Sequence, residues 1–209
     1  KLYLLVGGKG ERLSSVTKGK PKPLVEVNDR PFINYVLKNL KGFDITLVCS
    51  NETYWDFKGY ENIGLEVINE GHRAGTGGFL IKIAEDAPDS FYVMNGDSYF
   101  TGDLNLDVDK STVFVAEELI TDDVGYIKGK NGKVESFVEK DPTVSGNQLV
   151  NLGFYKFYKK DITLPMRLPI SIEYDILPNM ELEYKVLNTV RFDIGTPERL
   201  EKFKAWLPT

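Results

Sequence analysis

The sequence has one cysteine, one histidine and no long apolar run, and each shortage excludes a class of protein. Cys49 can form no disulfide within the chain, and its place in the apolar run 45–49 is typical of a buried strand. His72 has no cysteine or second histidine to complete a metal site, so we interpret it as a loop side chain. No apolar run approaches the ~20 residues of a membrane-spanning helix, and no signal peptide is visible. We expect a cytoplasmic protein with no membrane partner.

The chain also lacks an excess of positive charge. Its formal net charge of -5 argues against a nucleic-acid partner. With 209 residues, of which 42% are hydrophobic, it is long enough to form one domain with a full core. We find no internal repeat, low-complexity tract or linker. A single domain over residues 1–209 is therefore expected.

Apolar stretches typical of strands alternate with helical patterns. Strands are expected at residues 2–6, 43–50, 64–68, 90–94 and 113–116, and a core-facing helix begins at Pro31. Strands separated by helices imply parallel crossovers, so the fold class is α/β, a three-layer sandwich with a mostly parallel central sheet. Asn131-Gly132 predicts a hairpin within 126–140. We expect a loop at 191–197, in which Thr196 caps the last helix.

The first twenty-seven residues contain the most informative pattern. Glycines at 7, 8 and 10 follow the strand expected at 2–6, and they leave the backbone free to present N–H groups to an anion. The segment 9–22 has one acid, Glu11, and five basic side chains: Lys9, Arg12, Lys18, Lys20 and Lys22. In an acidic protein this local reversal of charge suggests a site for a polyanion. A glycine-rich turn followed by a solvated basic loop is the alternative.

Two common glycine motifs do not fit this segment. The Walker pattern is absent, and Leu13 stands where the dinucleotide fingerprint requires a third glycine. The order Gly-Gly-x-Gly-x-Arg-Leu and then Pro-Lys-Pro-Leu resembles the signature of the sugar-1-phosphate nucleotidylyltransferases. The resemblance implies a Rossmann-like, GT-A-type fold that transfers a nucleoside monophosphate from a nucleoside triphosphate to a sugar 1-phosphate. It also implies a nucleotide-binding half at about 1–110 and a sugar-phosphate-binding half at about 111–209.

The resemblance assigns catalytic roles to Arg12, Lys22 and Asp97. Arg12 would hold the β- and γ-phosphates, and Lys22 would lie between the attacking phosphate and the α-phosphate. Further contacts to the nucleotide are implied for Val6, Gly7, Gly8, Gly10, Glu11, Asn95 and Gly96. Glu11 stands where the family commonly has a small hydroxyl residue, and its carboxylate would repel a triphosphate unless it turns outward or pairs with a lysine or Mg²⁺.

A second glycine cluster precedes the helical pattern at 79–84. By resemblance, Gly75, Thr76, Gly77 and Gly78 lie against the base and ribose of the nucleotide. The alternative is that Thr76 caps the helix and that the glycines are needed only for packing.

Asp97 follows directly on the strand expected at 90–94, at the end where open parallel sheets bind ligands. Resemblance makes Asp97 a ligand of Mg²⁺, with Asp193 in Asp-Ile-Gly-Thr-Pro as the second acidic ligand. The alternatives are an Asx turn at Asp97 and a tight turn at Asp193 that ties the last helix to the sheet.

The resemblance also implies residues that bind the sugar phosphate. They are Glu139, Lys140, Asn151, Gly153 and Glu173. Glu173 and Asp175 could instead be acids of a first helical turn, favoured there by the helix dipole.

Among the subfamilies, the sequence is similar to heptose 1-phosphate guanylyltransferases, which implies GTP and a heptose 1-phosphate as substrates, with a homodimer as a possible assembly. A uridylyl- or cytidylyltransferase is the first alternative. A GT-A glycosyltransferase is the second, because Asp107-Val108-Asp109 matches its Asp-x-Asp motif, although these residues also fit a solvated turn. The third is a non-catalytic nucleotide-binding regulator.

Overall fold

The computed structural model describes residues 1–8, 10, 13–72, 74–102, 104–119, 124–138 and 144–207, and only the backbone of Ser14 and Ser15. The chain forms two compact units, and each is described by itself. Unit 1 consists of Lys1–His72, Met94–Thr101 and Val190–Thr209, and unit 2 of Arg73–Val93 and Gly102–Thr189. That one domain spans residues 1–209 stays a prediction.

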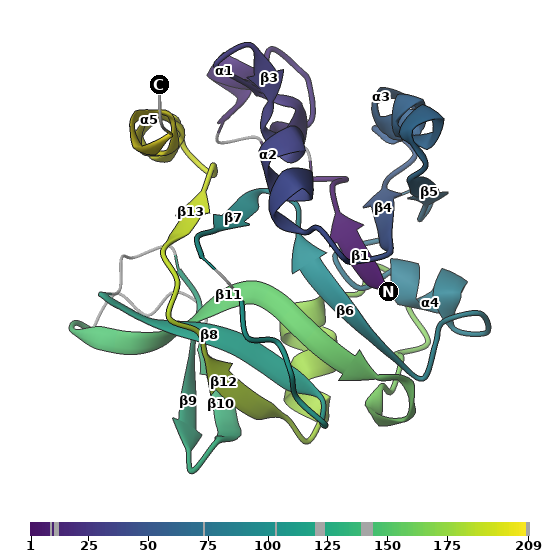
Figure 1. The fold of residues 1–209 in the computed structure, drawn as a ribbon. Coiled ribbons are helices and arrows are strands. Elements are labelled where there is room, and N and C mark those ends of the chain that lie inside the picture. The colour runs from purple at the N-terminus through teal and green to yellow at the C-terminus, as the bar shows by residue number, and fades with distance from the viewer. Residues whose placement is uncertain are drawn as a thin grey trace. The chain divides into compact units, whose positions relative to one another are not determined.

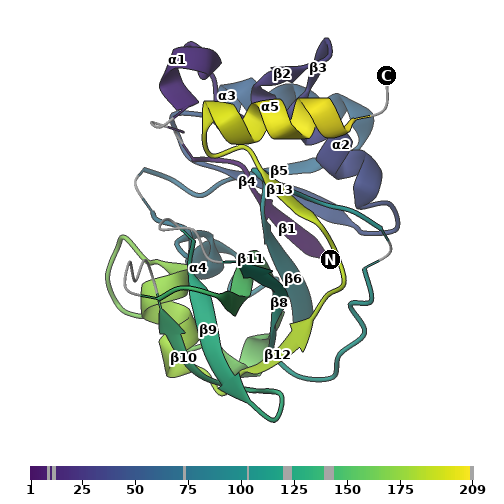
Figure 2. The ribbon, with the colours of Figure 1, turned by 90° about the vertical axis from the view of Figure 1, so that its left-hand side faces the viewer.

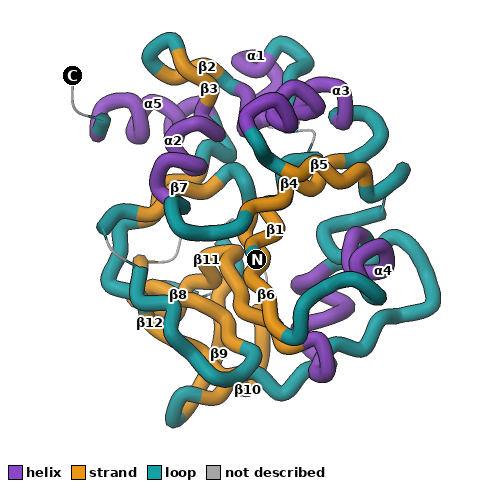
Figure 3. The backbone as a smooth tube through the Cα atoms, turned by 45° about the vertical axis from the view of Figure 1, so that its right-hand side comes forward, coloured by secondary structure: helices purple, strands orange, loops and turns teal. Residues whose placement is uncertain are grey.

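Unit 1 is built on parallel strands. β1 (Leu2–Leu5) pairs in parallel with β4 (Ile45–Cys49), which pairs in parallel with β5 (Glu66–Asn69) (Figure 3). β4 is buried along its whole length, as its apolar sequence predicts. The helices α2 (Phe32–Asn39) and α3 (Tyr54–Phe57) lie between these strands in the sequence, which is the order that parallel strands require.

Shorter elements complete the first part of unit 1. They are α1 (Ser14–Thr17), a 3-10 turn at Lys22–Leu24, the paired strands β2 (Glu26–Val27) and β3 (Arg30–Pro31), and a second 3-10 segment at Lys58–Ile63.

The last helix, α5 (Pro197–Trp206), packs on α2 through aromatic rings, and Figure 2 shows the two helices together. The ring of Phe203 is fully buried, with its centroid 5.0 Å from that of Phe32. Thr196 caps α5, and Pro197 is its first residue, both as predicted.

A short strand occupies the first part of the segment 191–197, for which the sequence predicts a loop. β13 (Arg191–Asp193) pairs antiparallel with β7 (Ser98–Phe100) (Figure 1). The prediction of a loop over 191–197 is therefore wrong for its first three residues. A stretch this short shows no period in the sequence, and its extended form comes from the ladder with β7.

Unit 2 is built on a mixed sheet. β8 (Thr112–Leu119) pairs antiparallel with β11 (Asn147–Tyr158) and parallel with β12 (Glu183–Val186). β10 (Lys133–Val138) pairs antiparallel with β12 and with β9 (Tyr126–Lys130). The turn between β9 and β10 has positive φ at both Asn131 and Gly132, which confirms the predicted hairpin.

Three further elements matter for the site. α4 (Phe79–Ile83) is a short helix, and Ile172–Ile176 is a helical segment that Ser171 caps. β6 (Ser90–Asn95) carries the chain from unit 2 into unit 1. Among the described residues, no helix combines the length and the apolar character that crossing a membrane requires.

Candidate active site

The first glycine loop begins where β1 ends. Val6 is buried and donates its N–H to the Val48 carbonyl at 2.8 Å, which extends the contact between β1 and β4 by one residue. A Cβ on Gly7 would lie 2.7 Å from the Ser50 nitrogen, so only glycine allows the chain to pass β4 this closely. Gly8 is exposed, and an added Cβ there would meet nothing within 4 Å.

Gly10 leaves room for the Lys22 side chain. Its φ of +66° lies in the left-handed region, and an added Cβ would overlap Lys22 Cγ. The Gly10 carbonyl also accepts the Leu13 N–H at 2.8 Å, which closes the turn. The glycine loop and the Pro-Lys-Pro-Leu segment are thus one packed unit, in which the aliphatic part of Lys22 lies against the backbone of Gly10.

The Lys22 ammonium group faces Asp97. Its Nζ lies 3.2 Å from Asp97 Oδ2, and the two side chains are 16% and 31% exposed. Asp97 follows Asn95, the last residue of β6, and Gly96, whose N–H donates to the Leu5 carbonyl at 2.9 Å. A Cβ on Gly96 would lie 2.7 Å from that carbonyl oxygen, so glycine is needed for the close approach to β1.

The pairing of β7 with β13 brings Asp193 beside Asp97. Asp193 lies opposite Ser98 in the ladder, and the Ile194 N–H donates to the Asp97 carbonyl at 3.1 Å. Two acidic residues from distant parts of the sequence therefore occupy neighbouring positions in unit 1. The alternative of Asp193 as a simple tight turn is incomplete, because this residue ends a strand.

This donor set fits a magnesium ion. Mg²⁺ binds oxygen and commonly uses one or two carboxylates together with substrate phosphates and water. Within the described ranges, no group of three or more acidic, histidine or cysteine side chains could hold an ion by itself. Asp97 and Asp193 could therefore supply part of the coordination, and the phosphates of a substrate would supply more.

In unit 2 the second glycine loop is fixed to the segment that follows Pro169. The Ile170 N–H donates to the Ala74 carbonyl at 2.9 Å, and the Gly77 N–H donates to the Ile170 carbonyl at 2.8 Å. A Cβ on Gly75 would overlap that carbonyl, and one on Gly77 would lie 2.8 Å from Ile170 Cγ2. Packing alone thus explains part of the requirement for glycine here.

The Thr76 hydroxyl joins the same two segments. It donates to Glu173 Oε2 at 3.0 Å and accepts the Ile172 N–H at 2.9 Å. The alternative that Thr76 caps the following helix is wrong, because the residue before α4 is Gly78 and no side chain caps it. Gly78 is buried, and an added Cβ would overlap Ala74.

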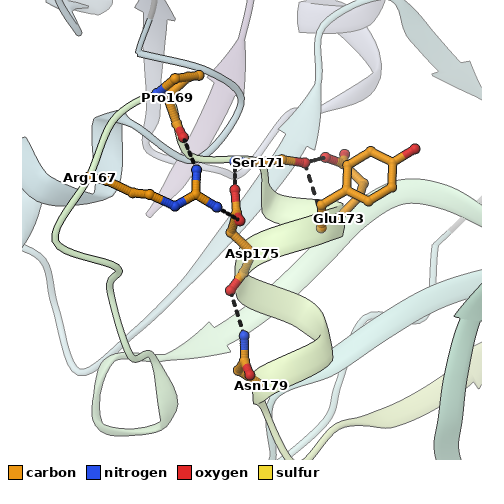
Figure 4. A network of polar contacts seen from close by, with 7 residues as sticks. Arg167, Pro169, Ser171, Glu173, Asp175 and Asn179 are labelled. Carbon is orange, nitrogen blue, oxygen red and sulfur yellow. Dashed lines mark hydrogen bonds and ion pairs between the residues drawn. The ribbon is translucent and has the colours of Figure 1, made fainter.

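Glu173 and Asp175 belong to a network that Figure 4 shows. Ser171 Oγ donates to Glu173 Oε2 at 3.0 Å and accepts the Tyr174 N–H at 3.1 Å. Asp175 accepts the Ser171 N–H at 2.8 Å and pairs with Arg167 at 2.7 Å. Both acids therefore stabilise the first turn of this segment, as one of the two interpretations predicts.

Asn151 and Gly153 form a bulge in β11. The register with β8 shifts between Asn151 and Phe154, and Gly153 has a φ of +65°. Asn151 Oδ1 accepts the Gly153 N–H at 2.9 Å, and its Nδ2 donates to the Tyr155 hydroxyl at 3.0 Å. The Asn-x-Gly-x-Tyr pattern has a structural role of its own here, because a left-handed glycine permits the bulge.

Two other features of the sequence are also explained. The backbone oxygens around Asp107 are held by lysines: Lys185 Nζ lies 2.9 Å from the Asp107 carbonyl, and Lys156 Nζ lies 2.5 Å from the Val108 carbonyl. Asp107 and Asp109 themselves are exposed in a loop, as the interpretation of a solvated turn predicts.

Burial raises the pKa of the Cys49 thiol to about 12, and the charges of Glu70 and Asp56 add to this effect, so the thiol is neutral at pH 7 and a poor nucleophile.

Four residues with predicted roles, Glu11, Arg12, Glu139 and Lys140, lie outside the described residues. Arg191 and Arg199, which contact Asp193, were not predicted from the sequence. Asp193 ends the strand β13 and Arg199 lies in the helix α5, so no single period could have linked them.

Comparisons with known proteins find a family model and several relatives that match this chain. A family model described as Nucleotidyl transferase matches residues 1–202. The D-glycero-alpha-D-manno-heptose 1-phosphate guanylyltransferase of Campylobacter jejuni is 29% identical over 213 residues, which cover 93% of this chain and 94% of that protein. The Bifunctional protein GlmU of Methanocaldococcus jannaschii is 28% identical over 211 residues, and this chain spans only 51% of its length.

The crystal structure of HddC from Yersinia pseudotuberculosis matches with a TM-score of 0.78 and 27% identity, covering 97% of this chain and 98% of that one. HddC complexed with GMP-PN matches with a TM-score of 0.75 and 26% identity. These similarities confirm the predicted Rossmann-like α/β nucleotidyltransferase fold.

Two glycines of the first loop provide a matched pair of variants. We expect Gly10→Ala to lose about 1–2 kcal/mol of unfolding free energy, because alanine is strained at a positive φ, with a further loss from the displaced Lys22 side chain. Gly8→Ala should stay within about 0.5 kcal/mol of the parent, since its methyl group meets open space. Urea denaturation measures both values, and equal midpoints for the two variants would contradict the packing of Lys22 on Gly10.

The link made by Thr76 can be tested by amide hydrogen exchange. Thr76→Val keeps the shape of the side chain but removes the hydroxyl, so the Ile172 N–H loses its acceptor and about 1 kcal/mol of local protection. We expect faster exchange at Ile172 in this variant and near-parental exchange in Thr76→Ser. Equal exchange rates in both variants would show that the hydroxyl does not hold the two segments together.

Proposed function

Because the chain belongs to the nucleotidyl transferase family, we propose that it transfers a nucleoside monophosphate from a nucleoside triphosphate to a sugar 1-phosphate and releases pyrophosphate. The observation that carries this proposal is the arrangement in unit 1, where Lys22 pairs with Asp97 and the β7–β13 ladder sets Asp193 beside it. A cation next to two carboxylates at strand ends is the composition that a phosphate-transfer site needs.

We further propose GTP and a heptose 1-phosphate as the substrates. The support is the named guanylyltransferase of Campylobacter jejuni, whose length this chain nearly matches, together with HddC and its complex with GMP-PN. Uridylyl and cytidylyl transfer, and other sugar phosphates, are the alternatives to be tested. The Pro-Lys-Pro-Leu segment counts against a glycosyltransferase, and Asp107 and Asp109 lie in an exposed loop, where they fit a solvated turn.

The reaction joins two anions. A phosphate oxygen of the sugar 1-phosphate attacks the α-phosphorus, a new P–O bond forms, and the bond from the α-phosphorus to the bridging oxygen breaks as pyrophosphate leaves. Electrostatic repulsion opposes the approach, so neutralisation of charge and alignment provide most of the catalysis, without a covalent enzyme intermediate.

Lys22 is proposed to neutralise this charge at the reacting phosphates. Its side chain is mostly buried, so its ammonium group acts where water screens it weakly. Gly10 supports the role, because the packing of the Lys22 side chain on this residue limits the rotamers that the lysine can adopt. The sequence adds Arg12 and the loop amides as ligands of the β- and γ-phosphates.

Asp97 and Asp193 are proposed to hold Mg²⁺. When bound, the ion supplies positive charge to the phosphate oxygens. The Lys22–Asp97 pair can then open, because the phosphates offer the lysine a new anionic partner.

Pyrophosphate release tests the proposed function. The protein is incubated with Mg²⁺, each of the four nucleoside triphosphates and a panel of sugar 1-phosphates that includes heptose, mannose and glucose. We expect release that depends on both substrates and is fastest with GTP and heptose 1-phosphate. Nucleotide binding without turnover would favour the regulator, and activity only with a preformed nucleotide sugar would favour a glycosyltransferase.

Lys22 gives a sharper test of the mechanism. We expect Lys22→Ala to lower kcat by about 10²–10³-fold with little loss of folding, because it removes the positive charge beside the reacting phosphates. Lys38→Ala, which changes an exposed lysine on α2, is the control and should retain the parental rate. A near-parental kcat in Lys22→Ala would exclude the proposed role.

A further inference from the structure

Three groups contact the Asp193 carboxylate, and two of them, the guanidinium groups of Arg191 and Arg199, lie outside the Asp-Ile-Gly-Thr-Pro motif. Arg199 Nη1 donates to Asp193 Oδ1 at 2.8 Å, and the Gly195 N–H donates to the same oxygen at 3.1 Å. On the other side, Arg191 Nη1 lies 3.5 Å from Oδ2. The Asp193 side chain is 16% exposed, so these contacts are poorly screened by water.

The first turn of α5 places the Arg199 guanidinium beside the Asp193 carboxylate. Thr196 Oγ1 accepts the Arg199 N–H at 3.4 Å, which fixes the first turn of the helix. Gly195 lies between Asp193 and Arg199 in the sequence, and a Cβ on Gly195 would come within 2.9 Å of Asp193 Oδ1. Glycine is thus required for the contact, and the helix cap orients the arginine.

These contacts treat the two carboxylate oxygens differently. A carboxylate oxygen has two lone pairs, and the pair of donors at Oδ1 uses both. Among the described residues, Oδ2 has only the longer contact with Arg191, so it is the oxygen left for an ion. We infer that Arg199 is a positioning residue, which holds the Asp193 carboxylate so that Oδ2 is presented to the metal ion. The inference rests on the metal role of Asp193 in the proposed function.

The alternative role for Arg199, simple neutralisation of the Asp193 charge, predicts the opposite change in metal affinity. If Arg199 only neutralised Asp193, its removal would free a negative charge and strengthen metal binding. If Arg199 positions the carboxylate, its removal lets the side chain rotate and weakens metal binding, as is typical when an outer partner of a metal ligand is lost. The sign of the change in metal affinity therefore separates the two roles.

The experiment uses Mn²⁺ as the probe in the complex with a non-hydrolysable GTP analogue. Water-proton relaxation gives the Kd of Mn²⁺ in this complex without any turnover. We expect Arg199→Met to raise this Kd by about tenfold or more. Arg199→Gln should raise it less, because the amide keeps an N–H donor without the charge. Lys202→Met, at an exposed position of α5, is the control and should leave the Kd unchanged.

An unchanged or lower Kd in Arg199→Met, in a variant that melts at the parental temperature, would overturn the inference. Should that variant fail to fold, Arg199→Gln provides the same comparison. Asp193→Asn separates this inference from its premise. If Asp193→Asn leaves the Kd of Mn²⁺ unchanged, Asp193 has no role in metal binding. If Asp193→Asn raises this Kd but Arg199→Met does not, only the positioning role of Arg199 is refuted.

Discussion

The three-residue ladder between β7 and β13 is the constraint on which the site in unit 1 depends. It sets Asp193 opposite Ser98 and lets the Ile194 N–H reach the Asp97 carbonyl. So short a ladder cannot hold two distant segments together by its own hydrogen bonds. Its paired residues Tyr99 and Phe192 both place their rings against Phe203 of α5, so the ladder is fixed by packing with the last helix. The C-terminal helix thus contributes to the site through hydrophobic contact.

Charge balance explains why two carboxylates can stay this close. Asp97 pairs with Lys22, and Asp193 pairs with Arg199 and Arg191, so neither anion is buried without a partner. The same pairing suits a site for anions, since a lysine that faces a carboxylate can exchange that partner for a phosphate when a cation takes the carboxylate.

Local patterns predicted the elements with clear periods and the motifs that lie on them. The buried strands β1, β4 and β6, the Asn131-Gly132 hairpin and the Thr196 cap follow from residues close together in the sequence. The β13 strand did not follow, because three residues contain no measurable period and their extended form comes from a distant partner. Arg199 was missed for a similar reason, as its contact with Asp193 needs a strand end, a glycine and a helix start together.

The second glycine loop shows a different limit of sequence reasoning. Gly75 and Gly77 are required because the loop lies directly on the Ile170 backbone, yet a loop that approaches a nucleotide would also require glycine. Close packing on the backbone and close approach to a nucleotide both require glycine, so the sequence alone cannot distinguish between them. The Thr76 hydroxyl also connects this loop to Glu173, a residue with a predicted role in binding the sugar phosphate. Two segments with predicted roles toward different substrates are therefore joined by direct hydrogen bonds.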